Sequence, residues 1–189
     1  MACKMLRMLL KEKTIKLAYK LFLPLAEQRI ARAQYELGLM YYKGQGVPQD
    51  YKEAGKWYRL AAGQGVTDAQ TNLGEKYHHG DGMPKDYQKA VKLYRLSAEY
   101  GYPKAQFNLG WMYKFGLGIP KDYKQTLKWW RLSAEQGDAD AQFSLGQMYA
   151  NGKGVLQNFE LAHMWFSLAS SQGGEIATYG RDAIEKKMS

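Results

Sequence analysis

The side chains best suited to chemistry are few and scattered along the sequence. His78 and His79 are adjacent, so on a helix they should point about 100° apart and could not share a metal ion as residues four apart can. His163 lies in a segment where we expect helix packing, with no partner to form a triad. Cys3 is the single cysteine, which excludes an internal disulfide, and no histidine lies near it in the sequence. The sequence therefore predicts no catalytic residue, no metal site and no cofactor.

Recurring glycine pairs resemble a fragment of a phosphate-binding loop. Gly44-x-Gly46 has part of this pattern, but no Lys-Ser or Lys-Thr pair follows, as a P-loop requires. The pair also falls between two expected helices. We therefore interpret these glycines as turn residues.

The net charge of +9 raises the question of an anionic partner. Residues 1–32 hold eight basic and two acidic residues, whereas the rest of the chain is nearly neutral. This distribution argues against a nucleic-acid channel along the molecule, so no specific nucleic-acid partner is expected. Weak binding of anionic surfaces or nucleic acid by the basic N-terminus remains the alternative. Arg7 divides the apolar stretch there, so we expect neither a signal peptide nor membrane-surface contact.

A 36-residue repeat organises most of the sequence. An Ala-Gln pair, a Leu-Gly pair and a tyrosine each return in phase in four copies, without insertion. In the first copy, Leu37 and Tyr41 lie on the apolar stripe of an amphipathic helix, and Tyr58 lies on that of a second helix. One such helix pair cannot cover its own apolar face, whereas stacked pairs can. The sequence therefore predicts an all-α protein, an α-solenoid of helix–loop–helix repeats.

Local signals predict where the helices of each copy begin and end. We expect the first helix to run from about Ala33 to Lys43, where the glycine-bounded loop stops it. Asp50 should cap the second helix, and Asp68 should cap the next copy. Gly38 recurs inside each first helix, which indicates close contact between neighbouring first helices.

The array extends beyond the four copies at both ends. Residues 14–28 match a second helix capped by Thr14, and Pro24 should kink or end it. Ala177 opens a polar helix of the kind that closes such an array. We divide the single continuous solenoid domain into a basic N-terminal cap and half repeat, four repeats and a C-terminal capping helix, at 1–32, 33–68, 69–104, 105–140, 141–176 and 177–189.

The repeat pattern resembles the Sel1-like repeat family, relatives of the tetratricopeptide repeat. The matching motifs are Ala-x-x-x-Leu-Gly-x-x-Tyr, Gly-x-Gly-Val-Pro-x-Asp-Tyr and Ala-x-x-Trp-Tyr-Arg-x-Ala-Ala. The resemblance implies a right-handed α/α superhelix and a non-enzymatic scaffold or adaptor, common in bacteria, that binds a peptide or protein on its concave face. Some bacterial relatives carry cysteine pairs and are linked to β-lactam hydrolysis. That hydrolase is the enzymatic alternative, although no copy here has such a pair.

By the same resemblance, the first helices line the concave face, so residues that differ between copies should bind the partner. Positions four, seven and eleven of each first helix share one face. The asparagines at position four have an alternative, structural interpretation. The predicted binding residues are Glu36, Leu39, Lys43, Asn72, Glu75, His79, Asn108, Trp111, Phe115, Ser144, Gln147 and Asn151.

Among these, Trp111 and Phe115 are four residues apart and should stack on one helix face. Glu75 and Gln147 occupy the Trp111 position in neighbouring copies, so this position should be exposed. We expect the two rings to anchor the partner, although they could instead fill a gap specific to the third copy.

The remaining expectations concern the outer surface, the compartment and the assembly. The single cysteine fits a reducing compartment, so we expect a cytoplasmic monomer, although a disulfide-free extracytoplasmic protein would look the same. A basic series on the second helices fits a solvated outer face better than a phosphate track. Its members are Lys56, Arg59, Lys92, Arg95, Lys128 and Arg131.

Overall fold

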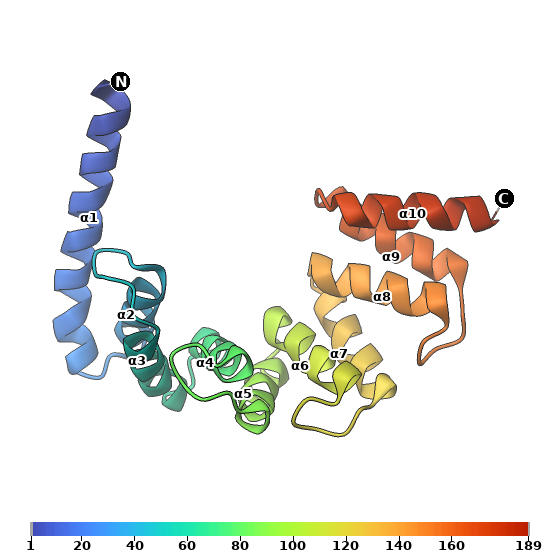
Figure 1. The fold of residues 1–189 in the computed structure, drawn as a ribbon, viewed down its shortest axis with the longest axis horizontal. Coiled ribbons are helices and arrows are strands. Elements are labelled where there is room, and N and C mark those ends of the chain that lie inside the picture. Colours follow the sequence, from blue (N-terminus) through green and yellow to red (C-terminus); the bar gives the residue numbers. More distant parts are fainter. Residues whose placement is uncertain (1, 189) are drawn as a thin grey trace. The chain divides into compact units, whose positions relative to one another are not determined.

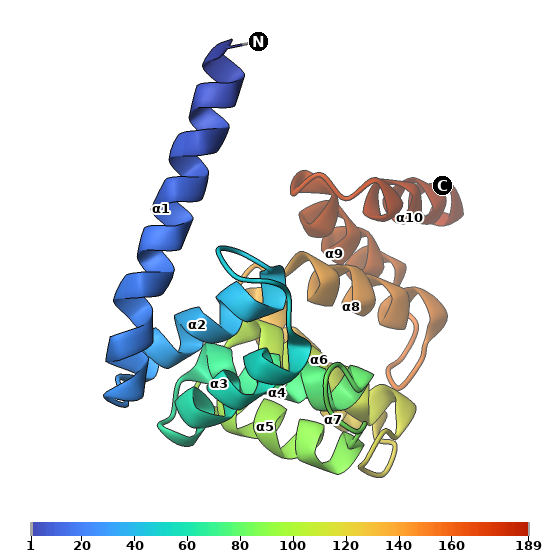
Figure 2. The same ribbon diagram turned by 60° about the vertical axis from the view of Figure 1, so that its left-hand side comes forward.

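A computed structural model describes the backbone of residues 2–188 and the side chains of residues 14–188. Within this range the regular structure consists of helices alone (Figures 1 and 2). The helices are α1 (Ala2–Glu27), α2 (Ala31–Lys43), α3 (Tyr51–Gly63), α4 (Thr67–His79), α5 (Tyr87–Glu99), α6 (Pro103–Phe115), α7 (Tyr123–Glu135), α8 (Ala139–Asn151), α9 (Phe159–Ser171) and α10 (Glu175–Met188). The α-solenoid of two-helix repeats predicted from the sequence is confirmed.

The chain forms two compact units, an N-terminal unit (Met1–Leu93) and a C-terminal unit (Tyr94–Ser189), and their boundary falls inside α5. In the N-terminal unit α1 packs against α2, α2 against α3, and α3 against α4. Leu37 of α2 is buried against α1, and Tyr58 of α3 is buried against α2 and α4. The apolar stripes of the repeat thus form a core between successive helices.

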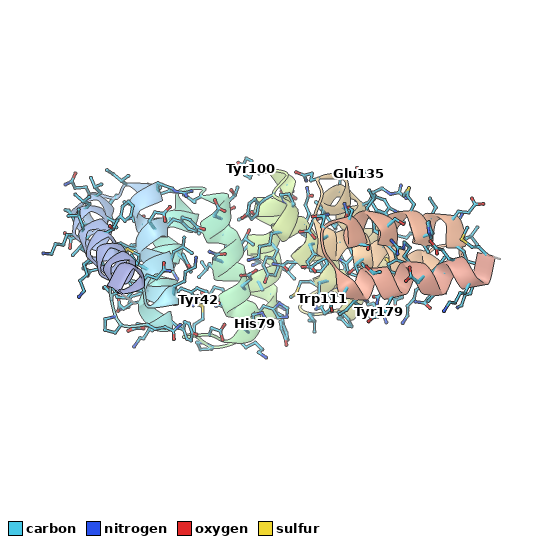
Figure 3. All side chains as sticks on the ribbon, turned by 90° about the horizontal axis from the view of Figure 1, so that it is seen from above. Tyr42, His79, Tyr100, Trp111, Glu135 and Tyr179 are labelled. Carbon is cyan, nitrogen blue, oxygen red and sulfur yellow. The ribbon has the colours of Figure 1, made fainter. Side chains whose placement is uncertain are left out.

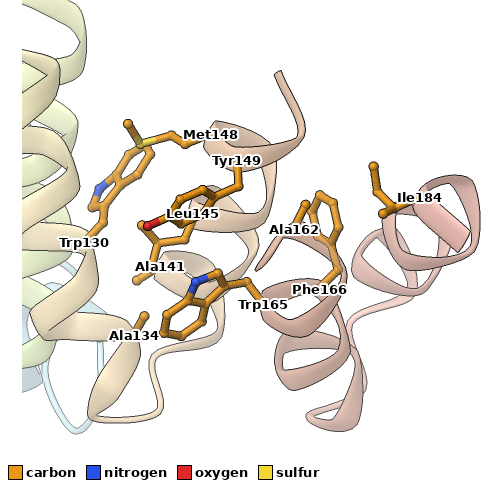
Figure 4. Packing of buried hydrophobic residues seen from close by; sticks show 10 residues of the cluster. All are labelled: Trp130, Ala134, Ala141, Leu145, Met148, Tyr149, Ala162, Trp165, Phe166 and Ile184. Atoms are coloured by element: carbon orange, nitrogen blue, oxygen red, sulfur yellow. The ribbon is translucent and has the colours of Figure 1, made fainter. Parts of the chain in front are cut away.

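In the C-terminal unit α6 to α10 pack in the same sequential way, and α10 also contacts α8. Trp130, Leu145 and Phe166 lie at the centre of its core, which Ile184 of α10 closes (Figure 4). The apolar stripe of the second helices therefore contributes aromatic rings to this core, and α10 covers its end.

Side-chain caps define the starts of the second helices. The Asp50 carboxylate accepts hydrogen bonds from the backbone N–H groups of Lys52 and Glu53, at 2.8 and 2.9 Å. This cap was predicted. Asp68, by contrast, is not a cap, because α4 begins at Thr67 with Val66 at the N-cap. The first helices begin about half a turn before the predicted start; α2, for example, begins at Ala31 rather than at Ala33. The helical backbone hydrogen bonds begin before the first residue of the apolar stripe.

A glycine inside each of the first helices α2, α6 and α8 makes room for an aromatic ring of the second helix that follows. A Cβ atom on Gly110 would lie 2.4 Å from the Trp130 ring, and one on Gly38 would lie 2.5 Å from the Tyr58 ring. The contact is therefore within one repeat. The expectation that these glycines allow close contact between neighbouring first helices was wrong about the partner. Even a methyl group at this position would overlap the ring, which explains why glycine recurs.

The end of α1 has the geometry of a second helix. Gln34 Nε2 donates to the Ala26 carbonyl oxygen at 3.0 Å, and the equivalent bond from Gln70 to Ala62 recurs one repeat later. The expected cap at Thr14 was wrong, because Thr14 lies within α1 rather than at its start. The helix does not end at Pro24 but continues to Glu27.

An arginine connects the recurring tyrosine of a first helix to the preceding second helix. The donor and acceptor pairs are Arg59 with Tyr77, Arg95 with Tyr113 and Arg131 with Tyr149, at 3.4, 3.0 and 2.7 Å. Tyr19 of α1 replaces the arginine for the first copy, with its hydroxyl 3.1 Å from that of Tyr41. That hydrogen bond raises the pKa of Tyr41 to about 12. Because its arginines have partners inside the protein, the exposed basic series is better explained as an outer face than as a phosphate track.

Candidate functional site

The predicted binding residues divide equally between the two units. In the N-terminal unit they lie on α2 and α4, and in the C-terminal unit on α6 and α8. Within each helix they occupy one face, as their spacing predicts. Nearly all are exposed or half-buried; the exception is Ser144, which is 6% exposed.

Trp111 and Phe115 form an aromatic pair at the surface of α6. The two residues are 36% and 49% exposed, and their ring centroids lie 4.7 Å apart with an angle of 49° between the ring planes. Figure 3 labels Trp111 among the side chains of the protein. The Lys114 ammonium lies 5.3 Å from the Trp111 centroid and 5.1 Å from that of Phe115. Two exposed rings of this size in contact with each other offer a large apolar contact area at a low cost in conformational entropy.

A recess of about 150 Å³ lies beside the aromatic pair, between α6, the start of α7, α8 and the loop that follows α8. Three of the predicted binding residues, Ser144, Gln147 and Asn151, meet in its lining. We call it the basic recess, and its lining residues are Lys114, Tyr123, Ser144, Gln147, Met148, Asn151 and Lys153.

Our sequence reasoning missed the two lysines and the tyrosine of the basic recess. Lys114 stands where other copies have Tyr42, His78 and Ala150, and this variation was the available signal. Lys153 lies in a loop, and no periodic pattern connects it to α6. Only the packing of three segments brings these side chains together.

Positive charge dominates the surroundings of the basic recess. Burial lowers the pKa of the Lys114 ammonium, and the nearby Lys153 charge lowers it further. The pKa of the Tyr123 phenol is also lowered, first by a hydrogen bond with Lys121 and then by the charges of Lys121, Lys153 and Lys114. No carboxylate is among the side chains that line this recess. The site is thus suited to an anionic group.

In the N-terminal unit, the residues at the same repeat positions have different chemistry. Lys76 of α4 stands where α2, α6 and α8 have a buried methionine, and it is only 2% exposed. Its ammonium lies 4.7, 4.8 and 6.0 Å from the ring centroids of Tyr42, Tyr51 and Tyr58. We call this group the lysine box. Sequence reasoning missed it, although the alignment of the copies shows a lysine among three methionines.

The Lys76 ammonium has no hydrogen-bond partner in the described part of the chain. Burial lowers its pKa, and the carboxylates of Asp81 and Asp50 oppose this effect only in part. Tyrosine faces attract a cation, but they do not replace the hydrogen bonds that an ammonium makes in water. The lysine box therefore holds a charge that is only partly compensated.

The Asn72 side chain lies beside two tyrosine hydroxyls of the N-terminal unit. Burial raises the pKa of the Tyr35 and Tyr58 hydroxyls, and the Asn72 side chain lies close enough to oppose this effect at both. The structural interpretation of position four thus has support here, although the neighbours of Asn72 are tyrosines rather than a loop backbone.

The histidines differ from expectation in their contacts. The His78 and His79 rings stack, with centroids 4.6 Å apart, so they do not point away from each other. His163 has a partner after all, because its Nε2 lies 2.8 Å from the Glu185 carboxylate of α10. The Cys3 side chain lies outside the described residues.

Two further properties of the described residues concern function. No group of three or more His, Cys, Asp and Glu side chains among them could hold a metal ion. None of the helices searched over that part of the chain has the length and apolar character needed to cross a membrane.

Fold and site together define a helical repeat protein whose surface side chains vary between copies. The Sel1 repeat matches residues 31–66, 67–102, 103–138 and 139–174, and the chain therefore belongs to the Sel1 repeat family. Proteins of this family generally act as protein-interaction scaffolds.

Two solved structures support this assignment. A Sel1 repeat protein from Oxalobacter formigenes is 34% identical with a TM-score of 0.84, over 89% of this chain and 67% of that one. A protective antigen with an SLR fold, from uropathogenic Escherichia coli strains, is 41% identical with a TM-score of 0.80 over 84% of this chain. The match spans only 34% of the antigen's own length. No curated protein matches the chain.

Proposed function

We propose that this protein is a non-enzymatic scaffold that binds a peptide or protein partner on the first-helix face of its C-terminal unit. The observation that carries the proposal is the aromatic pair, two exposed rings in contact with each other beside a recess. By the family resemblance, this is the concave face of the solenoid.

The surroundings of the aromatic pair favour binding over core packing. Lys114 lies over both rings, and the polar residues Asn108 and Gln147 share the face. Large rings surrounded by polar groups are typical of binding hot spots, where truncation often costs about 2 kcal/mol or more. Rings that only filled a gap in the core would be buried, whereas these are exposed.

The proposal is tested by Trp111→Ala combined with Phe115→Ala. We expect capture of the partner, identified by pull-down and mass spectrometry, to weaken at least about tenfold, or about 1.4 kcal/mol. The melting temperature should fall only slightly, because neither ring is buried.

A matched control removes two exposed apolar side chains of the same unit from its second helices. Leu132→Ala on α7 with Leu168→Ala on α9 serves this purpose, since both leucines are exposed. Capture should then be unchanged. Unaltered capture by the Trp111 and Phe115 double variant, or a large fall in its melting temperature, would show that the rings have a structural role instead.

A further inference from the structure

We propose that the basic recess binds a carboxylate side chain of the partner, so that the recognised segment is acidic and places an apolar residue on the adjacent aromatic pair. This inference rests on the proposed function and specifies the chemistry of the partner. Three properties of the recess support it: its donors, its charge and its position.

The first property is an excess of hydrogen-bond donors. Ser144 is 6% exposed and lines the recess, yet its hydroxyl makes no hydrogen bond with any described residue. The Asn151 side-chain amide donates to the Gln147 backbone carbonyl oxygen at 2.8 Å. The Gln147 side-chain amide makes no hydrogen bond with the described residues, so it can donate to a ligand in the recess. The Ser144 hydroxyl oxygen is not fully enclosed by protein atoms, so it can donate to an acceptor that enters the recess. An anionic acceptor in the recess would satisfy it.

The second property is positive charge that is not paired with a carboxylate. Neither Lys114 nor Lys153 forms an ion pair within residues 14–188, and the charge of Lys153 disfavours protonation of Lys114. A carboxylate between the two ammonium groups would reverse this repulsion and accept charge-assisted hydrogen bonds. No side chain of the recess could repel it, because the lining contains no acidic residue.

The third property is the position of Lys114. Its ammonium lines the recess and lies 5.3 Å or less from both ring centroids of the aromatic pair. One short segment can therefore place a carboxylate in the recess and an apolar side chain on the rings. The recess, at about 150 Å³, has room for a carboxylate and a few waters, since each water occupies about 30 Å³.

The experiment is a selection of random short peptides, displayed on phage, against the full chain. We expect the selected peptides to carry aspartate or glutamate close to a large apolar residue. Synthetic versions should bind about fivefold more weakly after glutamate-to-glutamine replacement and about fivefold more weakly to Lys153→Gln, because each change removes one charged hydrogen bond. Binding should also weaken with salt.

Lys128→Gln is the matched control, because Lys128 is an exposed lysine of the same unit outside the recess. It should leave peptide affinity unchanged. Peptides that depend on Trp111 and Phe115 but lack acidic residues, or that bind Lys153→Gln as well as wild type, would overturn the carboxylate site and leave the proposed function standing. Selected peptides whose affinity changes neither with the aromatic pair nor with Lys153 would overturn the carboxylate site and the proposed function together. A selection that yields no binding peptide would do the same. Displacement of the peptide by inorganic phosphate as readily as by free glutamate would show a general anion site instead.

Discussion

The lysine box and the basic recess are built from the same positions of the repeat, yet they handle charge in opposite ways. Lys76 in the N-terminal unit corresponds to Met148 in the C-terminal unit, and Asp81 corresponds to Lys153. In the lysine box, the protein places its own cation against tyrosine rings and partly offsets it with carboxylates. In the basic recess, methionine replaces that cation, and lysines gather around the remaining space.

This difference shows how a repeat protein can change the chemistry of one copy without changing the fold. The backbone elements that form the two sites are equivalent, since both use a first helix, the start of a second helix and the next first helix. Substitution of a few side chains determines whether the position is occupied by the protein or open to a partner. Specificity in such arrays therefore depends on copy-specific side chains.

The largest effect is expected from giving the C-terminal unit the buried lysine of the N-terminal unit. Met148→Lys would place an ammonium beside Lys114 and Lys153 without the nearby carboxylates that Lys76 has. We expect a loss of about 3 kcal/mol of unfolding free energy, since a buried charge without a partner is costly. Urea denaturation followed by circular dichroism measures it.

The neighbouring exposed position provides the control for that substitution. Gln147→Lys adds the same charge on the same helix but at an exposed site, and should change stability by less than about 0.5 kcal/mol. Combining Met148→Lys with Lys153→Asp should recover part of the loss. Equal effects of the two lysine substitutions would break the comparison between the units.

The converse change should stabilise the N-terminal unit. Lys76→Met removes an ammonium without a hydrogen-bond partner and installs the residue that α2, α6 and α8 use. We expect a gain of about 1–2 kcal/mol, because the lost attraction to the tyrosine rings offsets only part of the relief. Lys52→Met, at an exposed position of α3, should be nearly neutral. A loss of stability in Lys76→Met would show that the ring contacts outweigh the cost of burial.

The advantage of Lys76→Met should also depend on pH. Burial lowers the pKa of Lys76 in the folded protein below its usual value of 10.5, so between these two values the unfolded chain binds more protons. The stability of the wild type therefore rises with pH across this window, and the cost of burial is fully present below it. The difference between Lys76→Met and wild type should narrow as the pH rises from neutral towards 10.5. Tyrosine ionisation affects both proteins and should largely cancel; a constant difference would contradict the assignment.

The smallest effect concerns the turn after α1. Arg29 has a φ of 64°, whereas the equivalent residues in the later copies are glycines, with Gly65 at 86°. Because a side chain is strained in this left-handed conformation, Arg29→Gly should add about 0.5 kcal/mol after the entropy cost of glycine. Gln28→Gly, one residue earlier, should give no gain. Thermal unfolding of the two variants distinguishes them.

Much of the fold could be predicted because its signals are local. The apolar periodicity and the Asp50 cap act within a few residues, so they are visible in the sequence. The contact partner of Gly110 was not, because it lies on another helix and only the packed structure identifies Trp130. The start of α1 was also missed, since the repeat pattern covers only its second half.

The candidate site could be predicted less completely. The polar residues at the same position of neighbouring copies correctly indicated that Trp111 is exposed. Helical spacing correctly indicated that its ring contacts that of Phe115, although the two rings are tilted rather than stacked. It could not place Lys153 beside α6, because loops lack periodicity. Lysine is normally exposed, so Lys76 drew no attention until the copies were compared at the methionine position. Non-local packing of charged side chains was therefore the part that sequence reasoning missed.

The most direct test of the account is an amide chemical-shift map of the isotope-labelled full chain with a selected acidic peptide. The account predicts shifts at Ser144, Gln147 and Lys153 and at the Trp111 indole N–H, with the lysine box at Lys76 unaffected. These shifts should disappear in Lys153→Asp, which gives the basic recess the residue found at the same position in the N-terminal unit. Equal shifts around both sites, or binding by Lys153→Asp with the affinity of the wild type, would contradict the central claim that only the C-terminal recess is open to an anionic partner.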